Sequence, residues 1–171
     1  MTPTISTVRL VLRPLQKAST RNIAWLRDPK VVRYSEQRHC NHTLSSQLRY
    51  VNSFSGRSQL WAIVLIETGE HIGNISATHD APNNVADVGI MIGETTMWGK
   101  GFAKEAWARA CTWLLDKNGG GVRKLESGCM KSNEAMLKII RGSCFKQEGE
   151  LLNHFLYDGD PISCVLFGRM P

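Results

Sequence analysis

Residues 97–106 read Met97-Trp98-Gly99-Lys100-Gly101-Phe102-Ala103-Lys104-Glu105-Ala106 and combine a glycine-containing turn with the start of an amphipathic helix. The segment before them, Val85–Ile92, has the β-branched composition of a buried strand. A turn between a strand and a helix presents backbone N–H groups at the positive end of the helix dipole, where phosphate oxygens bind. Gly99 and Gly101 leave room for a close approach, and Lys100 adds positive charge. The stretch therefore predicts a diphosphate-binding turn; the alternative is an ordinary strand-to-helix loop.

The composition is that of a globular protein. The chain has 171 residues, of which 42 % are hydrophobic and 21 % charged, and this suffices for one domain with its own core. The longest apolar run, around Trp61–Ile66, is too short to span a membrane. The first residues lack the basic segment and hydrophobic run of a secretory signal. We therefore expect a cytoplasmic protein without a membrane partner.

The cysteines carry no metal or disulfide signature. There are five of them, an odd number at wide spacing, and no C-x-x-C pair occurs. We expect no metal site and interpret them as buried thiols in a reducing compartment.

The net charge of +6 suits nucleic acid, an acidic membrane surface or a phosphorylated small molecule. The basic residues are scattered, and no helix-turn-helix, zinc knuckle or basic stripe with interleaved aromatic residues is present. We therefore do not expect nucleic acid as a partner. A phosphate-rich cofactor accounts for the excess, but so does chance.

Helical and strand-like patterns alternate along the chain, with no internal repeat or linker. Three of the strands follow one another through short turns and predict an antiparallel meander. The fold class is therefore α/β (α+β), a mixed domain around a central sheet. The predicted strands are Val8–Arg13, Leu60–Glu67, His71–Thr78, Val85–Ile92, Lys124–Met130, Leu151–Tyr157 and Val165–Phe167, and the predicted helices lie around Ile23–Leu26, at Thr43–Phe54, from Phe102 onward and at Asn133–Arg141.

Helix ends are marked by typical residues. Ser19 or Thr20 is the predicted cap of the first helix, which Asp28-Pro29 ends. Thr43 or Ser45 is the predicted cap of the second.

These elements and their motifs resemble the GNAT superfamily of acyl-CoA N-acyltransferases, within it the branch that includes the ribosomal-protein N-terminal acetyltransferases. The family's acetyl-CoA signature falls on residues 98–103, with Trp98 where Arg or Gln usually stands. Further matches are Ile72-Gly73-Asn74, the segment from Asn133-Glu134-Ala135 to Glu148-Gly149, and Tyr157-Asp158-Gly159. The resemblance implies one N-acetyltransferase domain over residues 1–171, with about seven strands splayed at the cofactor cleft and about four helices.

The resemblance also implies acetyl-CoA as the cofactor. The amides of Gly99–Lys104 would hold its diphosphate, and the backbones of Met91 and Ile92 its pantetheine arm, with an N–H near Ile92 facing the thioester oxygen. Asn133 would bind the pantetheine or acetyl end; its alternative role is the N-cap of the last helix. Trp98 is expected to pack beneath the turn. The expected cofactor-binding residues are Met91, Ile92, Trp98, Gly99, Lys100, Gly101, Phe102, Ala103, Lys104 and Asn133.

Catalysis requires a base for the amine and a proton for the leaving thiolate. Asp87 matches the position of a glutamate in histone-type acetyltransferases, and a charge within an apolar strand is costly unless it is used. Its alternative role is a salt bridge or a turn-facing strand residue. Glu94 is the second candidate base, with a surface acid as its alternative. His71 and His79 are candidate proton relays or ordinary strand histidines.

The proton donor is less clear from the motifs, because Met136 stands where relatives carry Ser, and Gly142-Ser143-Cys144-Phe145 replaces K-L-G-F. Ser143 or Tyr157 is the candidate donor. Cys129 and Cys144 have no nearby histidine in sequence and are not expected to be covalent nucleophiles.

The acceptor is expected between Arg33 and Phe54 and in the hairpin turns, because the resemblance implies that the acceptor cleft is built there. Arg33, Tyr34, Glu36 and Arg38 suit a polar amine such as an amino sugar, a nucleotide sugar or a peptide N-terminus, and the arginines suit a phosphate or carboxylate on it. The alternative is a solvated loop. The predicted function is acetyl-CoA-dependent N-acetylation of a small-molecule or peptide amine in a ternary complex, by a monomer or homodimer. The rival is a non-catalytic acyl-CoA-binding or regulatory module on the same fold.

Overall fold

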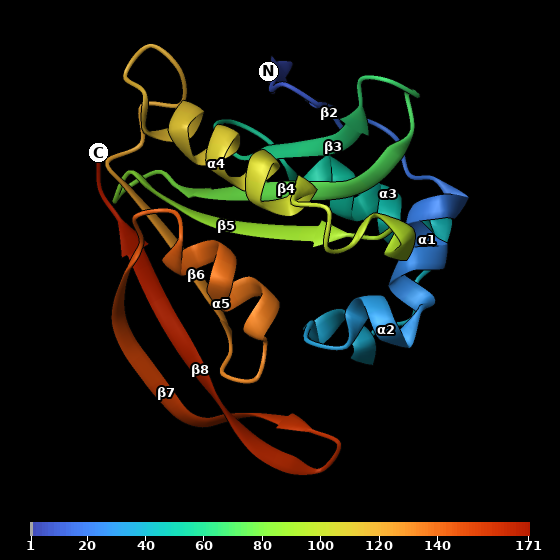
Figure 1. The fold of residues 1–171 in the computed structure, drawn as a ribbon, viewed down its shortest axis with the longest axis vertical. Helices are drawn as coiled ribbons and strands as arrows, with labels where there is room; N and C mark the ends of the chain where they lie inside the picture. Colours follow the sequence, from blue (N-terminus) through green and yellow to red (C-terminus); the bar gives the residue numbers. More distant parts are fainter. Residues whose placement is uncertain (1) are drawn as a thin grey trace.

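A computed structural model describes residues 2–171, which form an eight-stranded mixed sheet (Figure 1). The strand order is β1-β2-β3-β4-β5-β6-β8-β7, and all neighbouring pairs are antiparallel except β5 with β6. The predicted mixed sheet and its meander are confirmed; the short β1 is the one strand beyond the seven predicted, and the last two strands are longer than predicted. The strands are β1 Ile5–Ser6, β2 Leu10–Pro14, β3 Gln59–Leu65, β4 His71–Asp80, β5 Val85–Ile92, β6 Lys124–Met130, β7 Lys146–Tyr157 and β8 Asp160–Arg169.

The helices begin at side chains that cap their free N–H groups. Ser19 accepts from Asn22 N–H at the start of α1, and Thr43 forms a capping box with Ser46 at the start of α3. Asp28-Pro29 ends α1 as predicted but also starts a further short helix, because Pro29 occupies its first turn. The helices are α1 Thr20–Arg27, α2 Pro29–Val32, α3 Leu44–Ser53, α4 Phe102–Leu115 and α5 Glu134–Arg141, with short 3₁₀ turns η1 Glu36–His39 and η2 Thr95–Met97.

The main core lies between the sheet and the helices α4 and α5. Trp107 of α4 is completely buried, and its ring packs on Phe145 while its Nε1 donates to Ser143 Oγ. Every residue of β3 is buried, because α3 covers the opposite face of the sheet (Figure 1). Truncating a buried Trp to Ala typically costs about 3–5 kcal/mol, so this core holds the N-terminus of α4 firmly against the sheet.

The parallel pair β5–β6 separates after a short contact. Register partners extend only from Val85 with Lys124 to Asp87 with Glu126. One residue further on, Ser127 Oγ donates a 2.9 Å hydrogen bond to the Val88 carbonyl oxygen, so a side chain replaces the next backbone donor. Beyond this point the two strands diverge, and this separation is termed the gap below.

Candidate active site

The turn before α4 exposes backbone donors as predicted. Gly99 and Gly101 have φ of +75° and +82°, a conformation that favours glycine. A Cβ at Gly99 would meet no atom within 4 Å, so the turn faces open space. No side chain caps α4, and within residues 2–171 the N–H groups of Gly101–Lys104 find no acceptor. A phosphate fits here, because these N–H groups and the helix dipole lack a negative partner.

The gap exposes the edge of β5 to a second segment. Gly93 N–H donates to the Ile72 carbonyl oxygen, and Met91 is the register partner of Asn74. Alternate residues of an antiparallel strand direct their backbone groups to opposite sides, so Met91 faces β4, whereas Ile90 and Ile92 face the gap. The prediction for Met91 is corrected on this ground. The backbone groups that face the gap belong to Ile90 and Ile92, so the predicted position of Ile92 N–H is compatible with the geometry.

Trp98 closes the end of the gap. Its Nε1 donates a 2.8 Å hydrogen bond to the Ile92 carbonyl oxygen, and 45 % of the residue remains exposed. The ring therefore does more than pack beneath the turn, because it occupies one of the acceptors on the open edge of β5.

Asn133 caps α5. Its Oδ1 accepts from Met136 N–H at 3.2 Å, which is the alternative role considered for it. The cap uses the carbonyl end of the amide, so the NH₂ group stays available to a ligand.

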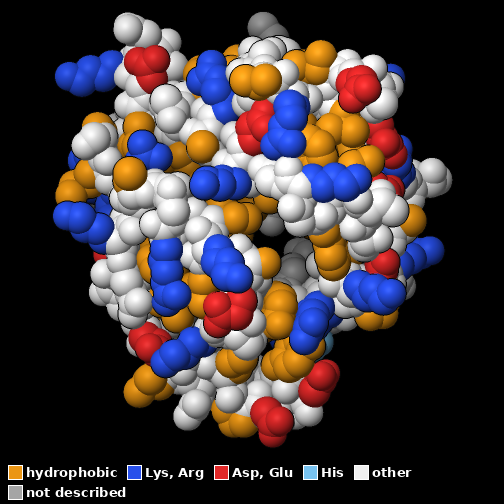
Figure 2. All heavy atoms as spheres, viewed as in Figure 1, with side chains coloured by type: hydrophobic (Ala, Val, Ile, Leu, Met, Phe, Trp, Pro, Cys, Tyr) orange, Lys and Arg blue, Asp and Glu red, His pale blue; other side chains and the backbone are white. Residues whose placement is uncertain are grey.

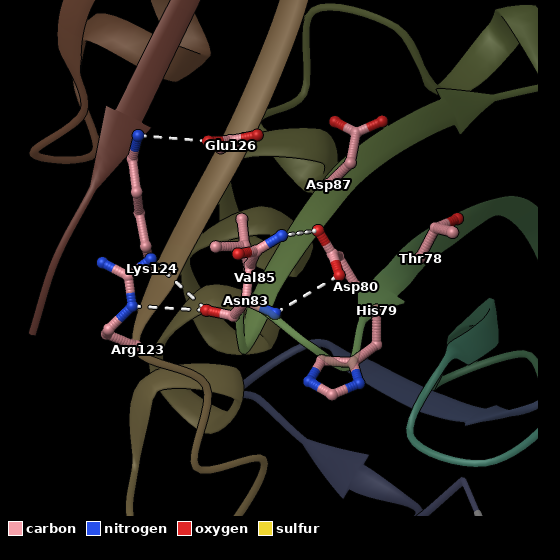
Figure 3. Close-up of a pocket in the computed structure, with 9 residues that line it drawn as sticks. All are labelled: Thr78, His79, Asp80, Asn83, Val85, Asp87, Arg123, Lys124 and Glu126. Carbon is pink, nitrogen blue, oxygen red and sulfur yellow. Dashed lines mark hydrogen bonds and ion pairs between the residues drawn. The ribbon is translucent and has the colours of Figure 1, made fainter.

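Asp87 lies on the face of the sheet opposite α4, opposite both Thr78 and Glu126 in register. Among residues 2–171 no salt bridge involves it, so the salt-bridge alternative is not observed. Restricted hydration, and then the charge of Glu126, raise the pKa of Asp87. It borders an open hollow of about 470 Å³, and Figure 3 shows its carboxylate apart from the hydrogen-bonded groups around Asn83.

Glu94 and the histidines are already engaged. Glu94 pairs with Arg21 at 3.2 Å, and this hydrogen bond is the main reason why the pKa of Glu94 is lowered. A carboxylate of low pKa is a weaker base, so Asp87 suits the role better. His71 Nε2 lies 2.8 Å from Asn74 Oδ1, and burial lowers the pKa of the His71 ring. His79 Nε2 lies 3.1 Å from Asn84 Oδ1.

The predicted acceptor residues meet the tip of the β7–β8 hairpin. Arg33 Nε donates to Tyr157 Oη at 3.1 Å, and the rings of Tyr34 and Tyr157 stack with centroids 5.8 Å apart. Arg38 Nη2 donates to the Leu156 carbonyl oxygen at 2.9 Å and pairs with Glu36 at 2.8 Å. Figure 2 shows a deep hollow in the centre of this view, and Figure 1 places the hairpin and the α2 region around it.

The remaining candidate donor, Ser143, is hydrogen-bonded within the core, and the five cysteines differ in their exposure. Ser143 Oγ bonds the Ile139 and Ile140 carbonyl oxygens as well as Trp107, which leaves Ser143 no catalytic part. All five cysteines are free; Cys111, Cys129 and Cys164 are buried as expected, whereas the expectation of burial is wrong for Cys40 and Cys144, which are exposed. Burial raises the pKa of Cys129 to about 11. Such a thiol is not an activated nucleophile at neutral pH.

Three comparisons agree with this geometry. A family model described as an acetyltransferase (GNAT) domain matches residues 9–146. The uncharacterized N-acetyltransferase p20 of Bacillus licheniformis is 25 % identical over 173 residues, which cover 98 % of this chain and 96 % of that protein. The spermidine N-acetyltransferase of Vibrio cholerae, solved with CoA and spermine, has a TM-score of 0.83 at 17 % identity and 96 % coverage of both chains. The microcin C7 self-immunity acetyltransferase MccE, solved with acetyl-CoA and AMP, has a TM-score of 0.78 at 15 % identity, covering 96 % of this chain and 94 % of that one.

Proposed function

The chain belongs to the GNAT acetyltransferase family and is an N-acetyltransferase, and from that premise we propose that it moves the acetyl group of acetyl-CoA to a small polar or peptidic primary amine. The observation that carries this proposal is the pairing of free N–H groups at Gly101–Lys104 with an open β5 edge at the gap. The first suits a diphosphate and the second an extended amide-bearing arm. Neither feature alone defines an acyl-CoA site, but one ligand uses both.

Different residues bind the different parts of acetyl-CoA. The turn Gly99–Lys104 binds the diphosphate, with Lys100 and Lys104 adding charge. The free backbone groups of Ile90 and the N–H of Ile92 bind the pantetheine arm, and the NH₂ of Asn133 is a further donor. Trp98 holds the end of β5 in place through the Ile92 carbonyl oxygen. Acetyl-CoA, when bound, supplies a thioester carbonyl that an amine can attack.

Asp87 acts as the base in this proposal, with Glu94 as the second candidate. Asp87 is the last residue of β5 that pairs with β6, and an amine can approach the gap there from the face opposite α4. The pKa of Asp87 is raised toward neutral pH, which makes its carboxylate a better proton acceptor. An N–H on the open edge of β5 stabilises charge on the thioester oxygen. The amine attacks directly, so the acetyl group is never attached to the protein.

The acceptor side is formed by Arg33, Tyr34, Glu36 and Arg38 together with Tyr157. In the part of the chain that the structure describes, Arg33 donates only through Nε to Tyr157, so its terminal N–H groups suit an anionic or carbonyl group on the acceptor. Tyr157 accepts this bond and keeps its own hydrogen, which suits a proton donor or an acceptor-binding hydroxyl. The relatives named above are described as binding spermine or AMP, which supports a polar acceptor without selecting one.

A second candidate function is a non-catalytic acyl-CoA-binding module. It is favoured by Met136, which offers no hydroxyl where relatives carry one, and by the structural role of Ser143. One domain over residues 1–171, a cytoplasmic location and a monomeric or homodimeric state stay predictions from the sequence.

The experiment is release of CoA thiol from acetyl-CoA over pooled primary amines, with mass spectrometry of the products. The wild type is expected to give amine-dependent release and an acetylated amine. Asp87→Asn should slow release, whereas Asp80→Asn, which removes the same charge from the same hollow, should not. Binding of acetyl-CoA without release for any amine would instead support the binding module.

A further inference from the structure

The first turn of α4 contains an acidic residue close to the proposed phosphate site. Glu105 lies four residues after Gly101, and its N–H donates to the Gly101 carbonyl oxygen at 3.1 Å. An uncompensated carboxylate here would repel a diphosphate, because both charges would compete for the same helix N-terminus. Partial burial acts to raise the pKa of Glu105, but the hydrogen bonds from Thr7 and Arg9 outweigh it and lower that pKa. The group is therefore ionised at neutral pH.

Arg9, from the segment between β1 and β2, surrounds this carboxylate with donors. Its backbone N–H donates to Glu105 Oε1 at 2.9 Å, and its Nε and Nη2 each lie 2.7 Å from Oε2. Thr7 Oγ1 donates to Oε1 at 2.5 Å. Both oxygens of the carboxylate are thus bound by donors, and its negative charge is compensated by the Arg9 guanidinium instead of acting on the turn.

The same guanidinium also contacts the turn itself. Arg9 Nη1 donates to the Lys100 carbonyl oxygen at 3.0 Å, and its Cζ lies 4.4 Å from the centroid of the Phe102 ring. A Cβ on Gly101 would lie 3.5 Å from Nη2. Arg9 therefore contacts Lys100 and Phe102, the two neighbours of Gly101, and the carbonyl orientation of these residues determines where the free N–H groups point.

From these contacts we propose that Arg9 is a positioning residue for acetyl-CoA, which fixes the diphosphate-binding turn and cancels the charge of Glu105. The inference rests on the proposed function. It predicts a specific effect on cofactor affinity from a residue that lies 90 positions before the turn and outside the signature motif.

A purely structural tie between the N-terminal segment and α4 is the competing explanation, and the chain offers a control for it. Arg109, one helical turn beyond Glu105, donates from Nε to the Ser6 carbonyl oxygen at 3.1 Å. It links the same two segments and carries the same charge but makes none of the contacts with the turn. Arg109→Gln therefore removes a hydrogen bond between the N-terminal segment and α4 and one positive charge, but it leaves the contacts of Arg9 with the turn in place.

The test is calorimetric titration of CoA into the wild type, Arg9→Gln, Arg9→Lys and Arg109→Gln, with thermal unfolding of each variant without ligand. Arg9→Gln is expected to weaken CoA binding about tenfold or more, and Arg109→Gln less than about twofold. Arg9→Lys keeps the charge but loses the planar guanidinium, so its CoA affinity should lie between those of Arg9→Gln and Arg109→Gln. In kinetics, the KM for acetyl-CoA should rise while kcat and the KM for the amine stay near wild type.

Adding Glu105→Gln to Arg9→Gln isolates the charge effect. Because the repelling carboxylate is then absent, the double variant should bind CoA more tightly than Arg9→Gln alone. Equal CoA affinity of Arg9→Gln and Arg109→Gln, or a double variant no better than the single one, would overturn the inference. Failure of the wild type itself to bind CoA would instead overturn the proposed function. Should Arg9→Gln unfold, the CoA affinities of Arg9→Lys and Arg109→Gln are compared instead: a weaker affinity of Arg9→Lys supports the inference, and equal affinities overturn it.

Discussion

Asp87 lies directly opposite Glu126 in the parallel pairing of β5 and β6, at the last paired position before the strands separate. Paired residues of adjacent strands project from the same face of the sheet, so their side chains are neighbours. The carboxylate of Glu126 also bonds Lys124 at 3.1 Å, whereas Asp87 has no cation partner within residues 2–171. The pKa of Asp87 is raised, and its carboxylate lies at the entrance of the gap.

Glu126→Gln should shift the acid limb of the kcat/KM profile to lower pH. The base must be ionised to act, so activity falls as the pH drops through the pKa of Asp87. Restricted hydration and the charge of Glu126 both raise that pKa, and Glu126→Gln removes the second cause. Glu150→Gln, on β7, removes an equal charge that pairs with Lys131 instead. A limb that stays in place or moves to higher pH in Glu126→Gln would contradict Asp87 as the base.

Asp87→Asn should raise thermal stability at neutral pH while it lowers activity. The pKa of Asp87 is higher in the folded than in the unfolded chain, so ionisation opposes folding. The destabilisation is absent below the pKa that Asp87 has in the unfolded chain. It grows between that pH and the higher pKa of the folded chain, and it is constant above the latter. The melting temperature of Asp87→Asn should therefore exceed that of the wild type at pH 7 and approach it at about pH 3. Equal melting temperatures at both pH values would show that Asp87 is well hydrated.

Gly101→Ala should weaken acetyl-CoA binding beyond its effect on stability. Both Gly101 and Gly69 have a positive φ, and Ala in that conformation costs about 1 kcal/mol. Gly69 lies in the β3–β4 turn, with open space around a Cβ. Urea unfolding should give similar losses for Gly101→Ala and Gly69→Ala, and calorimetry should give a weaker acetyl-CoA affinity for Gly101→Ala alone. Equal affinities would mean that the turn does not contact the ligand.

Cys144→Gly should stabilise the protein. Cys144 is exposed and has a φ of +62°, at the position that the family resemblance matches to the Gly of K-L-G-F. Relief of the left-handed strain, less the added entropy of the unfolded chain, leaves about 0.5 kcal/mol of stabilisation. Urea unfolding measures it, and Cys40→Gly is the control, because Cys40 has an ordinary φ of −103°. Destabilisation by Cys144→Gly would mean that the side chain makes a contact of greater value than the strain.

The features that the sequence predicted well are those set by neighbours along the chain. The strand Val85–Ile92 and the caps Ser19 and Thr43 depend on period and on short-range hydrogen bonds. The turn before α4 was predictable for the same reason, since glycines before an amphipathic helix leave its first N–H groups free.

The features that sequence reasoning missed depend on partners far away. The alternation of β5 was visible, but only its pairing with β4 shows that Ile90, and not Met91, faces the gap. The contact of Arg33 with Tyr157 joins residues 124 positions apart, and that of Arg9 with Glu105 joins residues 96 apart. No local pattern signals such contacts. The one hint in the sequence was Glu105, an acidic residue in the first helical turn after the predicted diphosphate-binding turn, because its charge needs a compensating cation from another segment.

Calorimetric titration of acetyl-CoA into the wild type and Gly101→Glu, with Gly69→Glu as a matched control, tests the central claim most directly. A carboxylate at Gly101 would project beside the free N–H groups of α4, whereas one at Gly69 lies in a distant turn with the same backbone conformation. We predict binding of one acetyl-CoA per chain by the wild type and by Gly69→Glu, and an affinity at least about tenfold weaker for Gly101→Glu. No binding by the wild type, or equal binding by all three proteins, would contradict the assignment of this turn as the acetyl-CoA site.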